Sequence, residues 1–371
     1  MRPRGKGGNM CARVDEARVA RVMAELEGEG SAVQLLVCDP YSIKYLTGFF
    51  VDRGERFGAL LLRSDKVPVL FNNALFPIGS YQNMEVVSFD DTDDVTRLVG
   101  SYVNPELPLG VDGELPARFL LPMQRASLAP SFYLGSFAVD RVRSHKDASE
   151  RERMRASSRV NDQVMAAIMR EVAPGVTERA LAARIEELFA SHGCSGLSFP
   201  SIVSFGAHAA DPHHEPDETV LSAGEVVLFD LGGVLDGYCS DMTRVCCVGE
   251  PDELTARIAR VVAEANEAAE AAVRPGARFC DIDRAAREVI EQAGFGPYFT
   301  HRLGHSIGMQ DHEPGDVSSA NDALLEPGMT FSIEPGIYLP GRTGVRIEDL
   351  VLVTDGGCEV LNALPHDLVV L

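Results

Sequence analysis

Short apolar runs alternate with amphipathic segments along the first 140 residues of the chain. Each run is rich in Leu, Val or Phe and ends at polar or turn-forming residues, which is typical of β-strands: 34–39, 57–63, 67–73, 85–91 and 108–113. Helical periodicity covers 14–27 and 116–127. Strands and helices in alternation predict an α/β layer.

The second half of the chain starts with a segment dense in charge, residues 140–155, which leads into a helical pattern that ends near Pro174 and Gly175. Such a shift in composition is typical of a domain boundary, and we place it near 143–150. Three more helices and four strands are predicted beyond it, the helices at 177–192, 252–273 and 279–293 and the strands at 226–233, 238–248, 330–338 and 346–353. We therefore expect a disordered tail over 1–10, an α/β domain over 11–145, and an α+β domain over 146–371 in which helices cover an antiparallel sheet.

Two aspartates meet in the first predicted hairpin of the second domain. Asp236-Gly237 is a strong signal for a two-residue turn, which would place Asp230 opposite Thr243. Asp241 is then the diagonal neighbour of Asp230 on the same face, at a Cα separation of about 7–8 Å. Carboxylates at this spacing repel each other unless a cation lies between them, and two metal ions roughly 3.5–4 Å apart would satisfy both.

A second hairpin, centred near Gly341, brings two glutamates together. It places Glu334 opposite Glu348, with Arg346 on the same face as Glu348 because side chains alternate along a strand. Both glutamates lie in apolar strands, where a charge without a partner is costly. Two explanations remain open for Glu334 at this point: a metal ligand, or a simple buried ion pair with Arg346.

The histidines of the second domain fall in two clusters. His301, His305 and His312 lie within THRLGHSIGMQDHE, and His213 lies within DPHHEPDE. Glycines at 304 and 308 flank His305 and would let backbone and ligand approach closely. Four carboxylates and a glycine-flanked histidine in one domain together indicate a metal site. The remaining histidines are interpreted as structural or bystanders: His145, His192, His208, His214 and His366.

Composition and charge restrict the function further. The formal net charge of −21 argues against nucleic acid and anionic membrane partners, which need clustered Lys and Arg. The chain has no run of eighteen apolar residues, and its basic first ten residues lack the apolar stretch of a secretory signal. The eight cysteines form no C-x-x-C pair, and several lie in apolar runs, which indicates reduced thiols in a cytoplasmic protein.

These motifs make the chain similar to the pita-bread metallopeptidases, which include prolidase, aminopeptidase P, methionine aminopeptidase and creatinase. The family pattern has an Asp, a second Asp eleven residues later, a His in a Gly-His-x-x-Gly stretch, and two Glu, the first in a Glu-Pro-Gly stretch. The resemblance implies two divalent metal ions, Mn²⁺ first and Co²⁺, Fe²⁺ or Zn²⁺ as alternatives, held by Asp230, Asp241, His305, Glu334 and Glu348. The first 140 residues resemble the creatinase-like accessory domain, which methionine aminopeptidases lack.

The resemblance also implies a reaction and roles for other residues. A hydroxide bridging two ions would attack the peptide bond before proline, with His213, His312 and Glu334 as catalytic residues. His301 and Arg346 would contact or support the substrate. A homodimer is the family expectation.

One departure from the pattern concerns substrate length. Dipeptidases of the family often carry a basic residue between the second site histidine and the first metal Glu, yet residues 313–333 contain no Lys or Arg. Arg302, Arg342, Arg346 or a partner subunit could replace it, or the pocket could accept longer peptides as in aminopeptidase P. Two other functions remain open: a same-fold hydrolase or lyase for a small non-peptide substrate, ectoine-hydrolase-like or creatinase-like, and a non-catalytic binding module.

Overall fold

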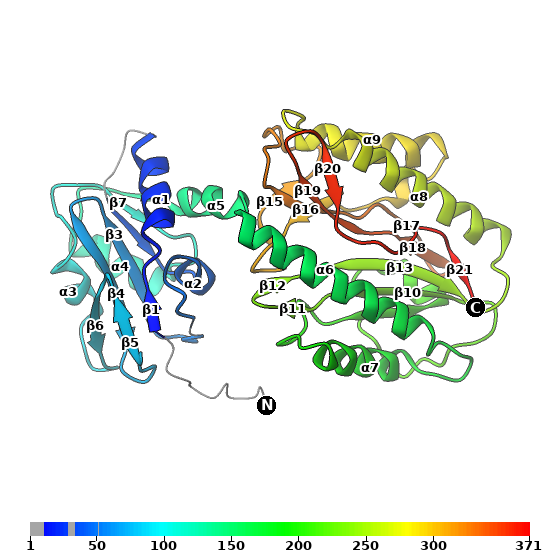
Figure 1. Ribbon diagram of the computed structural model, residues 1–371, viewed down its shortest axis with the longest axis horizontal. Helices are drawn as coiled ribbons and strands as arrows, with labels where there is room; N and C mark the ends of the chain where they lie inside the picture. The colour runs from blue at the N-terminus through cyan, green and yellow to red at the C-terminus, as the bar shows by residue number, and fades with distance from the viewer. Residues whose placement is uncertain (1–10, 29–33, 51) are drawn as a thin grey trace. The chain divides into compact units, whose positions relative to one another are not determined.

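A computed structural model describes residues 11–28, 34–50 and 52–371 of the chain. The chain forms two compact units, Met1–Arg143 and Ser144–Leu371, so that the division falls within the charged segment 140–155. The tail expected over 1–10 lies outside the described residues. Figure 1 shows the elements of both units in chain order.

The N-terminal unit contains a mixed six-stranded sheet with the order β6-β4-β3-β2-β7-β8. β2 pairs antiparallel with β3 and parallel with β7, while β4 and β6 run parallel. The strands are β2 (Gln34–Val37), β3 (Ala59–Arg63), β4 (Lys66–Asn73), β6 (Glu85–Phe89), β7 (Leu109–Val111) and β8 (Phe132–Leu134), with a separate parallel pair β1 (Cys11–Arg13) and β5 (Ser80–Gln82). The five helices described in this unit are α1 (Glu16–Gly28), α2 (Pro40–Thr47), α3 (Val95–Gly100), α4 (Ala117–Arg125) and α5 (Ser136–Ser144).

Central strands of this sheet are buried on both faces, which explains their continuous apolar sequences. Leu36, Leu61 and Phe71 pack with Val99 of α3 and Met123 of α4 in one core cluster. The five strands and two helices predicted for this region all form, whereas helices α2, α3 and α5 were not predicted. α2 is set by local chemistry, since the side chain of its N-cap Asp39 accepts from the backbone of residues 41 and 42.

The C-terminal unit contains two main sheets. The first has four strands in the order β21-β13-β10-β9, and the second has five in the order β15-β14-β16-β19-β20. The bounds of the first are β9 (Ile202–Phe205), β10 (Val226–Leu231), β13 (Met242–Cys247) and β21 (Val369–Val370), and of the second β14 (Gly304–Ser306), β15 (Glu313–Val317), β16 (Thr330–Ile333), β19 (Asp349–Val353) and β20 (Cys358–Val360). Two hairpins extend them, β11 (Val234–Leu235) with β12 (Tyr238–Cys239), and β17 (Gly336–Leu339) with β18 (Thr343–Arg346).

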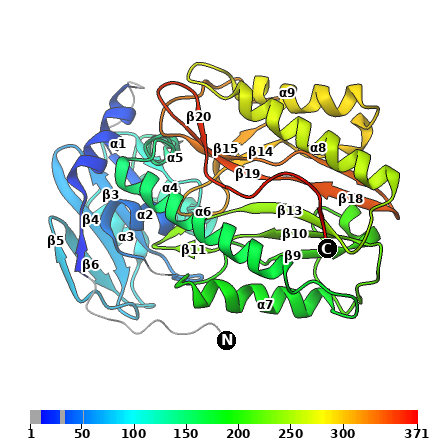
Figure 2. The same ribbon diagram turned by 45° about the vertical axis from the view of Figure 1, so that its right-hand side comes forward.

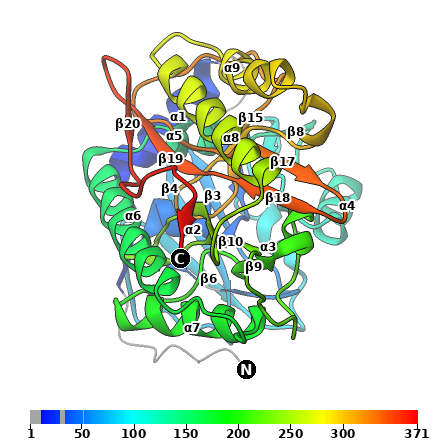
Figure 3. The same ribbon diagram turned by 90° about the vertical axis from the view of Figure 1, so that its right-hand side faces the viewer.

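Two pairs of long helices cover these sheets (Figure 2). α6 (Ala148–Met169) and α7 (Glu178–Ser191) share a core cluster with β9, β10 and β13. α8 (Glu253–Ala272) and α9 (Phe279–Gln292) share another with β16, β18 and β19. Figure 3 shows the two helix pairs on opposite sides of the sheets. Short 3-10 turns lie at Gly206–Ala210 and Gly296–Tyr298. The four helical patterns predicted for this unit therefore form within a few residues of the expected bounds.

Because side chains alternate along a strand, the acidic side chains of β10 and of the segment after β16 face the space between the two helix pairs. In β10, Phe229 and Leu231 pack on α6 and α7, so the intervening Asp230 points the other way. In β16, Phe331 and Ile333 pack toward α8 and α9, so Ser332 and the following Glu334 point away from them. Asp230 and Glu334 therefore both point into the space between the two helix pairs.

Two further features of the described chain bear on the sequence analysis. None of its helices is long and apolar enough to cross a membrane. The seven cysteines whose side chains are described are free, and three of them, Cys239, Cys246 and Cys247, are buried in or beside β12 and β13.

Candidate metal centre

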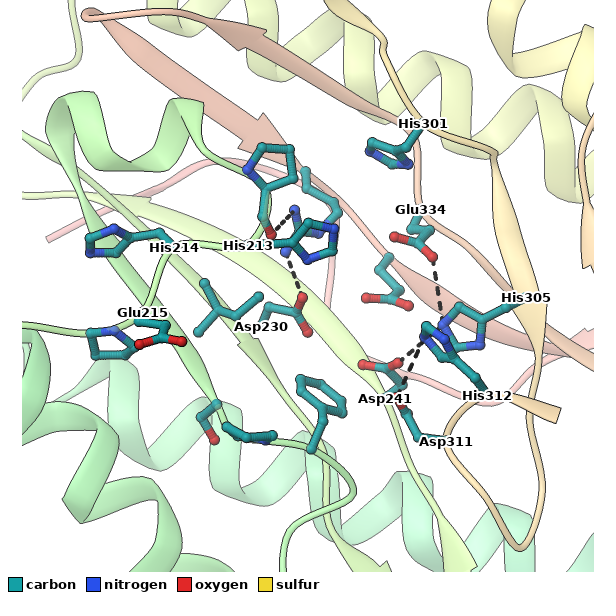
Figure 4. A pocket seen from close by; sticks show the side chains of 18 of the residues that line it. His213, His214, Glu215, Asp230, Asp241, His301, His305, Asp311, His312 and Glu334 are labelled. Carbon is teal, nitrogen blue, oxygen red and sulfur yellow. Dashed lines mark hydrogen bonds and ion pairs between the residues drawn. The ribbon is translucent and has the colours of Figure 1, made fainter. Parts of the chain in front are cut away.

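A single cavity of about 470 Å³ in the C-terminal unit brings together all the candidate residues of the sequence analysis. Its size is that of ordinary small-molecule sites, roughly 300–1,000 Å³. The candidates that line it are His213, Asp230, Asp241, His301, His305, His312, Glu334, Arg346 and Glu348. Figure 4 labels all of these except Arg346 and Glu348, and shows the labelled side chains converging from both sheets and from the loop that carries His213.

The aspartate pair is set by the hairpin that its turn predicted. Asp236 and Gly237 both have positive φ, 48° and 82°, as a type I′ turn requires. Asp230 lies opposite Thr243 in the β10–β13 ladder, and Asp241 follows as its diagonal neighbour. The register expected from the sequence is therefore confirmed.

The glutamate pair lies where two ladders meet. Ile333 pairs with Asp349, and Gly336 pairs with Arg346, so Glu334 and Glu348 occupy matching positions between these pairs, as the second hairpin predicted. Pro335 interrupts the strand there, which separates β16 from β17. The hydroxyl of Thr243 donates to Glu348 Oε2 at 2.8 Å, which ties this pair to the aspartate hairpin.

His305 presents one ring nitrogen to the carboxylates. Its Nδ1 lies 3.3 Å from the backbone carbonyl of Ser306, an acceptor, so Nδ1 carries the proton. Nε2 is then the free nitrogen, 3.7 Å from Asp241 Oδ2 and 3.6 Å from Glu334 Oε1. Burial lowers the pKa of this imidazole to about 3, so the ring is neutral and suited to bind a metal.

Gly304, one of the two glycines that flank His305, allows the strand of His305 to approach its neighbour closely. A Cβ on Gly304 would lie 1.9 Å from the backbone oxygen of Ser332 on the neighbouring strand. At position 308 glycine is favoured for a different reason, since a Cβ there would meet the carboxylate of Glu313 at 2.7 Å. The close approach is thus to protein atoms at both positions.

The clustered carboxylates of the site favour the binding of cations. Burial raises the pKa of Asp241 and of Glu348 well above the usual range, with the neighbouring carboxylates adding to it, and burial raises the pKa of Glu334 to about 8. Among the described side chains, the candidate ligands hold three buried oxygens without a hydrogen-bond partner, Asp230 Oδ1, Asp241 Oδ1 and Glu348 Oε1, and Asp311 Oδ1 in the same cavity also has none. Asp241, His305 and Glu348 offer ligand atoms within 4.8 Å of one another. This oxygen-rich set with one imidazole fits divalent metal ions.

Arg346 pairs with Asp230, which decides against the alternative ion pair with Glu334. Its Nη2 lies 2.5 Å from Asp230 Oδ2, and its Nε donates to the Thr243 hydroxyl at 3.1 Å. Its Nη1 donates to the hydroxyl of Tyr338 at 2.9 Å. The guanidinium is therefore buried against a candidate metal ligand.

His301 continues this chain of contacts. Its Nδ1 lies 2.7 Å from the carbonyl of Arg302, so Nδ1 donates and Nε2 accepts from the hydroxyl of Tyr338 at 2.9 Å. Burial lowers the pKa of His301 to about 4, in keeping with a neutral ring. Tyr338, which the sequence analysis did not single out, thus joins His301 to Arg346.

The remaining two candidates, His213 and His312, are exposed residues of the cavity wall. The rings of His312 and His305 have centroids 3.9 Å apart, and Arg302 Nη2 lies 3.5 Å from His312 Nδ1. Asp311 was missed by the sequence analysis although it lines the cavity. Burial and then the charge of Asp230 raise the pKa of Asp311 to about 7. Its place next to His312 in the sequence was the only available signal.

Comparisons with known proteins agree with this geometry. Residues 152–355 match the model of Metallopeptidase family M24, and residues 18–145 match the Creatinase/Prolidase N-terminal domain. The chain belongs to metallopeptidase family M24. The M24 assignment confirms the fold class expected from the sequence, an α+β pita-bread catalytic domain preceded by a creatinase-like α/β domain.

Relatives of known structure cover nearly the whole M24 chain. A dipeptidase PepE from Mycobacterium ulcerans is 35% identical, with a TM-score of 0.88 over 96% of this chain and 99% of its own. A prolidase from Thermococcus sibiricus is 31% identical, with a TM-score of 0.88 over 99% and 100%. An uncharacterized peptidase of Staphylococcus aureus is 36% identical over 354 residues, 93% of this chain and 98% of the relative. The protein is therefore an M24 enzyme, a family that implies divalent metal ions.

Proposed function

We propose that this enzyme hydrolyses the peptide bond that precedes proline, and that its preferred substrates are Xaa-Pro dipeptides. The observation that carries the proposal is the convergence of five metal-ligand candidates, four further histidines and the exposed guanidinium of Arg302 on one cavity. The similarity to a solved dipeptidase and a solved prolidase supports the same substrate class.

Asp230, Asp241, His305, Glu334 and Glu348 would hold two divalent ions, with Mn²⁺ as the first choice. When bound, the ions supply Lewis acidity, which polarises the scissile carbonyl and lowers the pKa of water. Glu334, which lines the cavity, would take a proton from the attacking water and deliver it to the leaving imino nitrogen. His213 and His312 lie at the cavity wall, where they would donate to the developing oxyanion and to the substrate amide.

Arg302 is the residue that favours dipeptides. Arg302 and Arg346 are the arginines that line the cavity, and no lysine does so among the described residues. Arg346 is buried and paired with Asp230, whereas Arg302 is exposed and has no described carboxylate within ion-pair distance. A guanidinium in this state matches the free C-terminal carboxylate of a dipeptide. It would replace the basic residue that is missing from 313–333.

The deciding experiment compares Ala-Pro, Ala-Pro-amide and Ala-Pro-Pro after metal removal and restoration of Mn²⁺. We expect metal-dependent cleavage that is fastest for Ala-Pro. Faster cleavage of Ala-Pro-Pro would assign an aminopeptidase P specificity instead. Absence of metal-dependent cleavage of all three would refute the peptidase proposal and direct the assays to small non-peptide amides. Sedimentation of the same sample tests the homodimer expected from the resemblance.

A further inference from the structure

The buried carboxylate of Glu178 holds both ends of the loop that carries His213. Glu178 is the first residue of α7, and its side chain is fully buried. The loop, residues 205–217, contributes Pro212, His213 and His214 to the cavity wall. The side chain of His213 is exposed. Its position therefore depends on what fixes the loop that bears it.

Each carboxylate oxygen of Glu178 contacts a different end of this loop. Oε1 accepts from the backbone nitrogen of Phe205 at 2.8 Å and lies 3.0 Å from His208 Nδ1. Oε2 accepts from the backbone nitrogen of Asp217 at 3.1 Å and lies 2.7 Å from His214 Nε2. One side chain thus closes a loop of thirteen residues, counted from 205 to 217.

The same residues are close enough to suggest a metal ligand set, but their bonds argue otherwise. Glu178, His208, His214 and Asp217 offer ligand atoms within 4.8 Å of one another. Both oxygens of Glu178 already have two partners each, and two of these are backbone N–H groups that a metal could not replace. This is a closed hydrogen-bond network, unlike the unpartnered oxygens of the metal centre.

We propose that Glu178 is a positioning residue for His213. The proposal rests on the role of His213 proposed above. Glu178 itself does not line the cavity, so it acts through the loop and not on the substrate. A second contact completes the arrangement, since Arg346 Nη1 lies 3.5 Å from the carbonyl of Pro212, next to His213. The loop is therefore held at its ends by Glu178 and near its tip by Arg346.

Substitution of Glu178 by Gln gives a sharp test because it preserves shape and removes an acceptor. The two backbone partners are donors that face different oxygens, so the amide nitrogen of Gln must face one of them and cannot accept its hydrogen bond. One end of the loop is then released. We expect kcat for Ala-Pro to fall about tenfold to a hundredfold, with KM and bound metal nearly unchanged, because misplacement of about 1 Å can cost roughly a hundredfold.

A double-mutant cycle with His213→Ala separates positioning from general stability. If Glu178 acts through His213, E178Q lowers kcat in the wild-type background but adds less than about twofold in the H213A background. Multiplicative losses, with H213A itself impaired, would refute the coupling. Full activity of H213A would instead refute the proposed role of His213.

Hydrogen exchange tests the loop itself, independent of catalysis. E178Q should speed exchange over 205–217 and leave the strands of the metal centre unchanged, whereas unaltered exchange there would overturn the proposal. The matched control is Glu150→Gln, another buried glutamate in the first turn of a helix, which accepts from Tyr238 and from the backbone of Asp147. It should not change exchange over 205–217. If E178Q does not fold, His208→Ala, which removes one of the four contacts, should show the same changes at smaller amplitude.

Discussion

The guanidinium of Arg346 and the carboxylate of Asp230 form a buried ion pair, with Nη2 and Oδ2 2.5 Å apart. The pair occupies one oxygen of Asp230 and leaves the other, Oδ1, buried without a described partner. One oxygen is thus oriented by the protein and the other is available to a metal ion. The two residues come from different hairpins, so the pair also joins the two halves of the site.

Arg346→Met should destabilise the metal-free protein by about 3–5 kcal/mol, because it leaves the carboxylate of Asp230 buried and unpaired. Added Mn²⁺ should restore part of this loss, since an ion would neutralise the same carboxylate. Urea unfolding with and without Mn²⁺ measures both effects. The control is Arg342→Met in the exposed β17–β18 turn, for which the change should stay within about 0.5 kcal/mol.

Asp241→Asn should separate stability from activity. We expect activity to fall at least about a thousandfold and bound metal to decrease, because a metal ligand is lost. The metal-free variant should nevertheless be as stable as the wild type or more so, since a buried carboxylate that repels its neighbours becomes neutral. Metal analysis and thermal unfolding in chelator test this. A fully metallated, active D241N would refute the ligand assignment.

Arg302→Gln should weaken the hydrolysis of Ala-Pro more than that of Ala-Pro-amide. The loss of a guanidinium–carboxylate contact should reduce kcat/KM for Ala-Pro by roughly tenfold to a hundredfold, while the amide, which lacks the carboxylate, changes little. Arg342→Gln serves as the control, because Arg342 lies outside the cavity. Equal losses for both substrates would show that Arg302 does not bind the carboxylate.

The pH dependence of stability should report the buried imidazole of His301. Burial lowers the pKa of His301 from 6.5 to about 4, so between these values the unfolded chain holds a proton that the folded chain does not. Its contribution to stability is full above pH 6.5 and is lost as the pH falls toward 4, at up to about 1.4 kcal/mol per pH unit. His301→Gln should flatten the stability profile in this window. The same substitution at the exposed His192 should not.

Gly304→Ala should impair metal binding although Gly304 is not itself a candidate ligand. The added Cβ would meet the carbonyl of Ser332 at 1.9 Å and push the two strands apart, at a cost of about 1–3 kcal/mol or more. His305 would move with its strand. Mn²⁺ titration of G304A and of Gly356→Ala, where a Cβ meets nothing within 4 Å, tests whether the effect is local.

The local part of the site could be predicted from the sequence. Asp236-Gly237 determines a turn, and the two-residue period of a strand then fixes which side chains share a face, so both acidic pairs followed from residues close in the chain. Strands β2 and β10 could likewise be predicted, because each is a run of mostly apolar residues. Strands β9, β14 and β15 were not predicted, because none of them contains more than two consecutive apolar residues.

Contacts between distant segments could not be predicted. Arg346 pairs with Asp230 and not with Glu334 because the folded chain brings two separate hairpins together. The two paired residues are 116 positions apart in the sequence. Asp311 lines the cavity, and Tyr338 joins His301 to Arg346, for the same reason. Glu178 had the appearance of an ordinary first-turn glutamate, since nothing in its own helix indicates the loop that it holds.

Each acidic pair of the metal centre lies within one short stretch of chain, eleven residues from Asp230 to Asp241 and fourteen from Glu334 to Glu348. Closing such short loops costs little chain entropy, so the hairpins are fast, local events in folding. In the absence of metal, however, each closure forces like charges together at the very step that starts the sheet. Divalent ions are therefore expected to act during folding as well as in catalysis, by removing an electrostatic barrier to strand pairing before the two halves of the domain meet.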